Sequence, residues 1–310
     1  IDKYVTPVLC AVGVTGNTVS LAVWLQRRMR QSSGYYMVTL ALNDLIFLAL
    51  LVVFELHVVW GVRTLNHPVI CELYPVVYLA TQFLSTFLVL GFTVERYISV
   101  CHPFKRDKYC TVRKAKLAIA SMTLFVFLLT APYGYFFTID DTGADLECQV
   151  RESIREGQFE SIYNRYTLSV DMLSFLVVPV IVLTFNILVI IELRRLSRLE
   201  QAQLHGSPQR TAANTAMLLT VSFYLILTTL PVSITYAFQG SAALEPEEIP
   251  TADSQALQLH RTYDFVLKIV KEYGITHYVF NFFIYLITGR MFRQELKRIF
   301  LQPFRKLSSS

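Results

Sequence analysis

Seven long apolar runs separated by polar segments constrain this chain more than any other feature of its sequence. Each run is near the ~20 residues that an α-helix needs to cross the hydrocarbon core of a bilayer. We therefore predict an all-α membrane protein, a seven-transmembrane helix bundle that forms one domain over residues 1–310. The expected helices cover about residues 6–26, 36–61, 68–101, 113–137, 163–197, 209–239 and 260–287.

Composition favours a membrane class and argues against nucleic-acid binding. Hydrophobic residues make up 54% of the chain and charged residues 16%, which lies well off the averages for soluble proteins. The net charge of +5 is spread between the apolar runs and forms no basic face with interleaved aromatic residues. The lipid bilayer is therefore an expected partner, and nucleic acid is not.

The segment after the seventh run predicts a short amphipathic surface helix at about residues 290–301. Apolar residues fall there at helical spacing, opposite basic residues, a pattern typical of a helix that lies on the inner membrane surface. These apolar residues are Met291, Phe292, Leu296, Ile299 and Phe300.

Loop charge predicts how the bundle sits in the membrane, because cytoplasmic loops accumulate Lys and Arg. The first, third and fifth connections and the C-terminal tail are basic, whereas the connections after the fourth and sixth runs are acidic. We therefore expect a multi-pass plasma-membrane protein with its N-terminus extracellular and its C-terminus cytoplasmic. The acidic residues expected outside are Asp140, Asp141, Asp145, Glu147, Glu152, Glu156, Glu160, Glu245, Glu247, Glu248 and Asp253.

This orientation separates the five cysteines by redox compartment. Cys71, at the outer start of the third run, and Cys148, in an acidic connection, face the oxidising side. Cys101 and Cys110 face the reducing cytosol, and Cys10 lies in lipid or core. A disulfide between Cys71 and Cys148 is the expected pairing, with two free thiols as the alternative. The chain has no C-x-x-C spacing, so no metal site built from cysteine is expected.

Asp44 lies deep in the second apolar run, where a carboxylate is costly and marks a candidate functional site. We place three polar residues of other runs around it: Asn17 in the first, Ser85 in the third and Asn281 in the seventh. The alternative is that Asp44 is a hydrogen-bonded or protonated packing residue.

The polar residues inside the runs form a recurring pattern over essentially the whole chain. The motifs are, in chain order, Gly16-Asn17, Leu40-Ala41-x-x-Asp44, Cys71, Glu95-Arg96-Tyr97-x-x-Val100-x-x-Pro103, the prolines Pro179 and Pro231, and Asn281-x-x-x-Tyr285. With these motifs in this order, the chain resembles the rhodopsin-like (class A) G-protein-coupled receptors.

The resemblance implies roles for the residues at the cytoplasmic ends of the helices. Glu95, in the motif it shares with Arg96 and Tyr97, would restrain Arg96 in the resting state. Arg96 would then meet the C-terminal helix of a G-protein α subunit, and Tyr285 would turn inward to support the open state. The implied partners are heterotrimeric G proteins, arrestin and receptor kinases.

The resemblance also implies an allosteric sodium ion, with no other cofactor. Asn17, Asp44, Ser85 and Asn281 would line a sodium and water pocket that collapses on activation. Asp44 and Ser85 would be the sodium ligands.

Five residues depart from the family pattern; two of them are Met122, in place of a fourth-helix tryptophan, and Ile187, in place of a fifth-helix tyrosine. Phe282 stands where the seventh-helix motif has proline, Thr229 where the sixth helix usually has tryptophan, and Leu225 where phenylalanine is usual one turn earlier. The family's aromatic switch and its seventh-helix proline kink are therefore not expected. Pro231 should still bend the sixth helix, because proline lacks the backbone donor.

Two positions exclude common ligand classes of this family. Tyr78 stands where amine receptors carry an aspartate, so a biogenic amine would lack its counter-ion. Ile275 stands where opsins carry the retinal lysine, and a Schiff base requires a lysine amine.

The outer face is predicted to suit a cationic ligand. Its acidic loops are joined by Glu55 on the second run and Asp171 on the fifth, and complementary charge raises encounter rates and specificity. Further candidates for the wall of the binding cavity are Tyr74, Tyr78, Gln82 and Tyr236. The alternatives are a solvated acidic surface and ordinary helix packing by the aromatic residues.

The segments 93–116 and 281–293 are similar to neuropeptide receptors, especially the branch of invertebrate FMRFamide receptors and thyrotropin-releasing-hormone receptors. That similarity implies an extracellular peptide ligand, amidated at its C-terminus and carrying an arginine near its end. A receptor for a non-peptide ligand is the first alternative.

Two other classes fit the sequence less well. A transporter or channel would need broken helices repeated in two halves, and no such repeat is found in the sequence. An enzyme would need a catalytic motif, and the sequence contains no H-E-x-x-H, no G-x-S-x-G and no P-loop.

Overall fold

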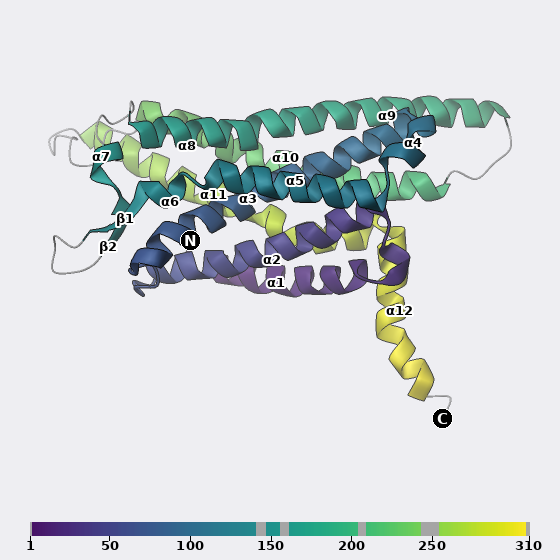
Figure 1. Ribbon diagram of the computed structural model, residues 1–310, viewed down its shortest axis with the longest axis horizontal. Helices are drawn as coiled ribbons and strands as arrows, with labels where there is room; N and C mark the ends of the chain where they lie inside the picture. Colours follow the sequence, from purple (N-terminus) through teal and green to yellow (C-terminus); the bar gives the residue numbers. More distant parts are fainter. Residues whose placement is uncertain (1, 141–146, 156–160, 204–208, 243–253, 308–310) are drawn as a thin grey trace.

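The computed structural model describes residues 2–140, 147–155, 161–203, 209–242 and 254–307, and these form an elongated helical bundle (Figure 1). The long helices are α1 (Val5–Trp24), α2 (Ser32–Val58), α3 (Pro68–Cys101), α5 (Val112–Thr130), α8 (Ile162–Met172), α9 (Val178–Gln203), α10 (Gln209–Ala242), α11 (Ser254–Thr288) and α12 (Arg290–Leu307). Shorter elements are the 3₁₀ turn η1 (Arg27–Met29), α4 (Pro103–Tyr109), α6 (Tyr133–Phe136), α7 (Glu152–Arg155) and the π-helical turn η3 (Leu173–Val177).

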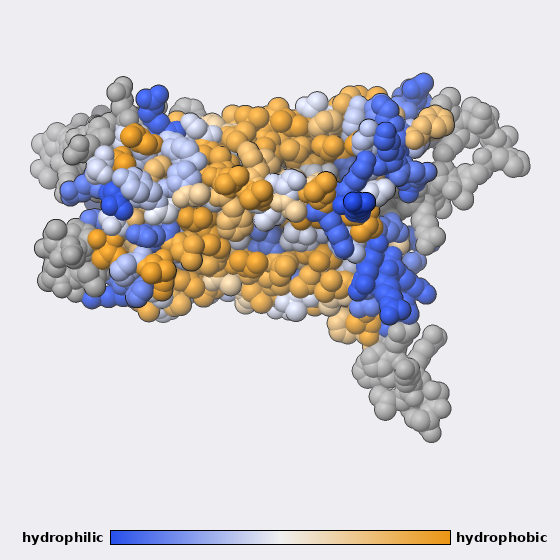
Figure 2. Space-filling view, viewed as in Figure 1, coloured by the Kyte–Doolittle hydropathy of each residue, from blue (hydrophilic) through white to orange (hydrophobic). Residues whose placement is uncertain are grey.

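Apolar side chains cover the middle of the bundle and hydrophilic ones gather toward both ends, as Figure 2 shows for one face. This is the distribution expected of a protein whose solvent is lipid at the middle and water at the ends. Within the described residues, six helical segments are long and apolar enough to cross a membrane. They are Val5–Trp24, Ser32–Val58, Pro68–Cys101, Val112–Phe136, Ile162–Arg198 and Thr215–Thr235.

The helix α11 is as long as the others, with 35 residues, but it carries Lys268, Lys271 and Glu272 along its length. It nevertheless packs inside the bundle, against α1 and α10. At its end the chain turns at Gly289, and α12 runs crosswise away from the bundle (Figure 1).

Several helices have bounds that differ from the hydrophobic runs. The helix α2 begins at Ser32, earlier than expected. The helix α10 extends to Ala242 and α11 begins at Ser254, so the connection between them is shorter than the sequence predicted. Backbone hydrogen bonds continue through polar turns that hydropathy does not mark, so the apolar pattern locates the crossing and not the helix ends. The fourth run is divided between α5 and α6 at Pro132, which has no backbone N–H to donate.

The connection after α6 contains a structure that the apolar pattern does not predict, a two-stranded antiparallel sheet of β1 (Phe137–Asp140) and β2 (Glu147–Val150). Cys148 in β2, opposite Ile139, forms a disulfide with Cys71 in the first turn of α3. The predicted pairing is confirmed. The disulfide joins positions 77 residues apart and ties the hairpin to the end of the bundle opposite α4 and α12 (Figure 1).

The helix α3 lies in the middle of the bundle and contributes more buried residues than any other described helix, among them Phe83, Leu88 and Phe92. A second buried cluster joins α1, α2 and α11 through Phe47, Leu48 and Val279. This contact requires a glycine at position 13, because a Cβ there would stand 2.7 Å from the Leu48 side chain. The close approach brings α11 to α1 and α2 at the level of the polar residues described next.

Candidate functional site

A buried cluster of polar residues joins three helices at the centre of the bundle. Asp44 on α2 is completely buried; Ser85 of α3 donates to its Oδ1 at 3.0 Å, and Asn281 of α11 donates to its Oδ2 at 2.8 Å. Both carboxylate oxygens therefore have a donor. The structure brings together three of the four residues that the sequence placed here.

The fourth, Asn17 of α1, makes different contacts. Its amide donates to the carbonyl of Gly13 at 3.0 Å and to that of Tyr278 at 2.7 Å, so it joins α1 to α11 without a hydrogen bond to Asp44. Its Oδ1 has no partner among the described residues, and the same holds for the buried hydroxyl of Tyr285.

Asn43 belongs to this cluster and was missed by the sequence analysis. Its amide donates to Ser85 Oγ at 2.8 Å and to the Thr81 carbonyl at 2.7 Å. Asn43 therefore positions the Ser85 hydroxyl that donates to Asp44. An asparagine adjacent to a membrane aspartate was the available signal, since both are costly in lipid unless they have partners.

At the opposite end from the hairpin, Glu95 is buried at the start of the segment 95–97. Its Oε1 accepts from the Ser32 hydroxyl at 2.7 Å, across to the first turn of α2. Across the described residues, no hydrogen bond or ion pair joins Glu95 to Arg96, and their interaction is electrostatic. The first partner of Glu95 is thus a serine rather than the arginine that the sequence implied.

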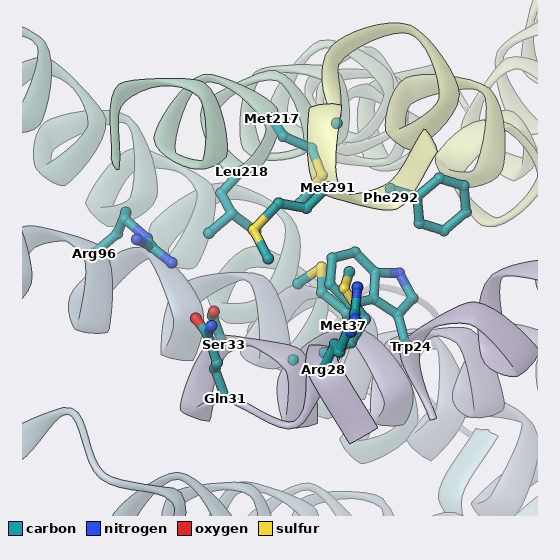
Figure 3. Close-up of a pocket in the computed structure, with 13 residues that line it drawn as sticks. Trp24, Arg28, Gln31, Ser33, Met37, Arg96, Met217, Leu218, Met291 and Phe292 are labelled. Carbon is teal, nitrogen blue, oxygen red and sulfur yellow. The ribbon is translucent and has the colours of Figure 1, made fainter. Parts of the chain in front are cut away.

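Arg96 instead faces a pocket enclosed by α1, α2, α10 and α12. Figure 3 shows its guanidinium pointing toward the pocket, opposite Trp24 and Phe292. The Arg96 Nε is buried and has no hydrogen-bond partner in the described chain. The remaining walls are mainly apolar, with Arg28 as a second cation; further lining residues include Met37, Met217, Leu218 and Met291.

Tyr97 and Tyr285, two of the residues with a predicted role in activation, pack against rings of neighbouring elements. The Tyr97 ring lies 5.0 Å from that of Phe185 on α9, which joins α3 to α9. Tyr285 is completely buried, with its ring 5.6 Å from Trp24 and 5.4 Å from Phe292.

Cys110 follows α4 and lies close to the backbone of Glu95. Its thiol is within 3.5 Å of the Glu95 carbonyl oxygen. Burial, together with the Glu95 carboxylate, raises the pKa of the Cys110 thiol above its usual range. The side chain therefore remains a neutral thiol at neutral pH.

The departures from the family pattern have structural counterparts. The helix α11 is unbroken at Phe282, whose ring packs 6.1 Å from Phe292 and against Gly16. Thr229 is buried and donates to the Leu225 carbonyl of its own helix at 2.8 Å.

At the hairpin end of the bundle, aromatic rings stack between α2 and α3. Tyr78 lies 5.5 Å from both Phe47 and Tyr74, and Tyr74 donates to the Leu50 carbonyl at 2.7 Å. Gln82 contributes its backbone oxygen, which accepts from Tyr278 at 3.1 Å. These rings therefore pack on one another, the alternative that the sequence left open, and Tyr236 has a side chain outside the described residues.

Three carboxylates lie toward the hairpin end of the helices, at two separate places. Glu55 of α2 interacts electrostatically with Glu272 of α11, and the second oxygen of each is buried without a hydrogen-bond partner in the described chain. Asp171 of α8 instead lies near Tyr133 and Tyr163. Sequence analysis missed Glu272 because neighbouring lysines made it look like part of a solvated helix end.

Part of the predicted acidic surface falls on residues that the structure does not describe. Asp141, Asp145, Glu156, Glu160, Glu245, Glu247, Glu248 and Asp253 lie outside the described residues.

A bundle of apolar helices with a buried aspartate, a disulfide-linked hairpin at one end and an exposed basic end defines a multi-pass membrane protein. The family model described as "7 transmembrane receptor (rhodopsin family)" matches residues 16–285. The chain therefore belongs to the rhodopsin family of seven-transmembrane receptors.

Among curated proteins, the chain is similar to several peptide receptors. It is 22% identical to the sex peptide receptor of Drosophila melanogaster, over 96% of this chain and 72% of that receptor. It is 24% identical to the FMRFamide receptor of the same organism, over 95% of this chain but only 52% of the receptor's length. A shorter match, 31% identical over 43% of this chain and 33% of the relative, is to the human thyrotropin-releasing hormone receptor.

Proposed function

We propose that this protein is a plasma-membrane receptor that binds an extracellular cationic neuropeptide, amidated at its C-terminus, and activates heterotrimeric G proteins. Membership of the rhodopsin family and similarity to receptors named for peptides support this proposal. The observation that carries the ligand class is Glu55, whose carboxylate has an oxygen without a partner among the described residues. An arginine of the ligand would supply the missing donors.

In this proposal α11 is the seventh span and α12 lies along the inner membrane surface. The packing of α11 against α1 and α10 supports its insertion in the membrane despite its charged residues. The N-terminus and the disulfide-linked hairpin are then extracellular, and the basic α4 and α12 are cytoplasmic, in agreement with the positive-inside rule.

The signalling end of the receptor would be the pocket at Arg96. An agonist that binds the open bundle better than the closed one shifts the population toward the open form. Movement of α10 would carry Met217 and Leu218 away from Arg96 and admit the C-terminal helix of a G-protein α subunit. Receptor kinases and arrestin would act on the same cytoplasmic end.

A sodium ion fits the centre of the bundle in part. The Asp44 carboxylate and the Ser85 hydroxyl are oxygen donors of the kind that hard cations prefer, and both lie in one buried cluster. Each retains a lone pair beyond the hydrogen bonds described above. Sodium bound there would favour the closed bundle by keeping the negative charge of Asp44 in place.

The test is a panel of amidated peptides, beginning with FMRFamide, applied to transfected cells while intracellular calcium and cyclic AMP are recorded. We expect a response that requires the peptide arginine, and a loss of potency of about tenfold or more on Glu55→Gln. Glu72→Gln, at an exposed carboxylate on α3, is the matched control.

A negative panel would favour the non-peptide alternative. Solute or ion flux in liposomes without any G protein would instead favour a transporter or channel.

A further inference from the structure

We propose that Glu55 and Glu272 together form a two-carboxylate site that binds one guanidinium group of the ligand. The site lies between the outer parts of α1, α2 and α11. It deepens the proposed function, on which it rests for the identity of the ligand, by assigning a second carboxylate to the recognition of the cation.

Glu272 is held in place for this role. It is only 9% exposed, and one of its carboxylate oxygens accepts a hydrogen bond from the Thr6 hydroxyl of α1. The other oxygen, Oε2, is equally buried and has no partner among the described residues. A side chain fixed by one oxygen thus presents a second oxygen that still requires a donor.

Glu55 likewise presents an oxygen that lacks a donor. Its Oε2 is buried without a hydrogen bond in the described part of the chain. Glu55 lies one helical turn beyond Leu51, and Glu272 lies three residues before Ile275; Leu51 belongs to the buried cluster that joins α1, α2 and α11, and Ile275 packs against it. At this place the carboxylates of Glu55 and Glu272 interact electrostatically with one another and with Asp2. The described charges around this place are therefore mainly negative.

The nearby cation is engaged elsewhere. Lys271, next to Glu272 on α11, interacts electrostatically with Asp2 and Asp264. Its position in the helix directs it away from its neighbour, because adjacent residues of an α-helix do not face each other. Lys271 therefore interacts with aspartates rather than with its neighbour Glu272.

A guanidinium matches this arrangement better than an ammonium. It presents five N–H donors in a fixed planar fork, so that one group can donate to two carboxylates. Two buried like charges repel, and a buried acceptor without a donor costs free energy. The ligand-free receptor thus bears a cost at this place that the ligand removes.

The first arm of the test measures stability without ligand. In Glu272→Gln the amide oxygen can still accept from Thr6, while the charge is removed. We expect the apparent melting temperature of the purified receptor to rise by about 2 °C, which corresponds to about 1 kcal/mol for a chain of this size. Glu55→Gln should act in the same direction, and Glu72→Gln should have no effect. A fall in melting temperature for Glu272→Gln would mean a purely structural role and overturn the proposal.

The second arm uses agmatine as the probe, a small guanidinium compound, with N-butylurea as an uncharged comparison. Millimolar agmatine should raise the melting temperature of the wild-type receptor, and this rise should be lost in Glu55→Gln and in Glu272→Gln. An equal rise in all three proteins, or none in the wild type, would overturn the site.

These outcomes are separate from those of the peptide panel. Stabilisation by agmatine without any peptide response would keep the site and reject the proposed neuropeptide ligand. A peptide response that is unchanged in Glu272→Gln, with no agmatine effect, would keep the receptor function and reject the site.

Discussion

The central carboxylate and the outer carboxylates of this bundle differ in how completely they are hydrogen-bonded. Asp44 is fully buried, yet each of its oxygens accepts from a side chain of another helix. Glu55 and Glu272 each keep an oxygen without a donor in the described residues. A carboxylate with its donors in place stabilises the helix packing around it, whereas one that lacks a donor is prepared for an external partner.

The substitution with the largest expected effect is Asp44→Leu, which tests whether the hydrogen-bonded carboxylate stabilises the helix packing. The change leaves the Ser85 hydroxyl and the Asn281 amide buried without their acceptor, at about 1–3 kcal/mol for each group. We expect the apparent melting temperature and the amount of receptor at the cell surface to fall. Glu55→Leu, which removes a carboxylate of the other kind from the same helix, should lower neither by a comparable amount.

A smaller expected effect is the dependence of agonist binding on sodium, which should involve Asp44 and not Glu272. If Asp44 holds sodium in the closed bundle, raising sodium should weaken agonist binding several-fold, in the range of typical allosteric coupling. Asp44→Asn should abolish this dependence, whereas Glu272→Gln should retain it. Radioligand binding measured at constant ionic strength, with choline replacing sodium, separates the specific ion from screening; a sodium effect that survives Asp44→Asn would remove the ion from this site.

The smallest expected effect concerns another buried carboxylate, Glu95. Ser32→Ala removes the hydroxyl that donates to Glu95 and leaves the carboxylate free to restrain Arg96. Basal nucleotide exchange on a co-reconstituted G protein should fall by about twofold, since one hydrogen bond contributes roughly 0.5–1.5 kcal/mol. Ser121→Ala, at an exposed serine of α5 whose hydroxyl donates to its own helix, is the control, and an increase in basal exchange with Ser32→Ala would contradict this account.

The features that sequence analysis predicted are those in which lipid imposes the constraint. Apolar length predicts where helices cross, and Asp44 had to be near other polar side chains because lipid offers none. The pairing of Cys71 with Cys148 followed from the same topology, since their partners were limited to one side of the membrane.

The features that it missed depend on the choice among several partners. Nothing in the order of residues indicated that Asn17 would donate to backbone carbonyls, or that Glu95 would accept from Ser32 rather than Arg96. Glu272 was overlooked because its local charge pattern resembles a solvated helix end, and only its contact with Thr6 of α1 distinguishes it. Rotation of each helix about its axis decides such contacts, and the apolar runs specify that rotation only roughly.

Phe282 gives α11 a mechanical property that a proline at this position would remove. The backbone amide at residue 282 remains available, so the ladder of helical hydrogen bonds has no missing rung between the outer and inner ends. From Glu272 to Tyr285 the helix spans about 20 Å at 1.5 Å per residue. A tilt or twist applied where Glu272 meets α1 would therefore be transmitted along a continuous rod to the Tyr285 ring, with no flexible joint to absorb it.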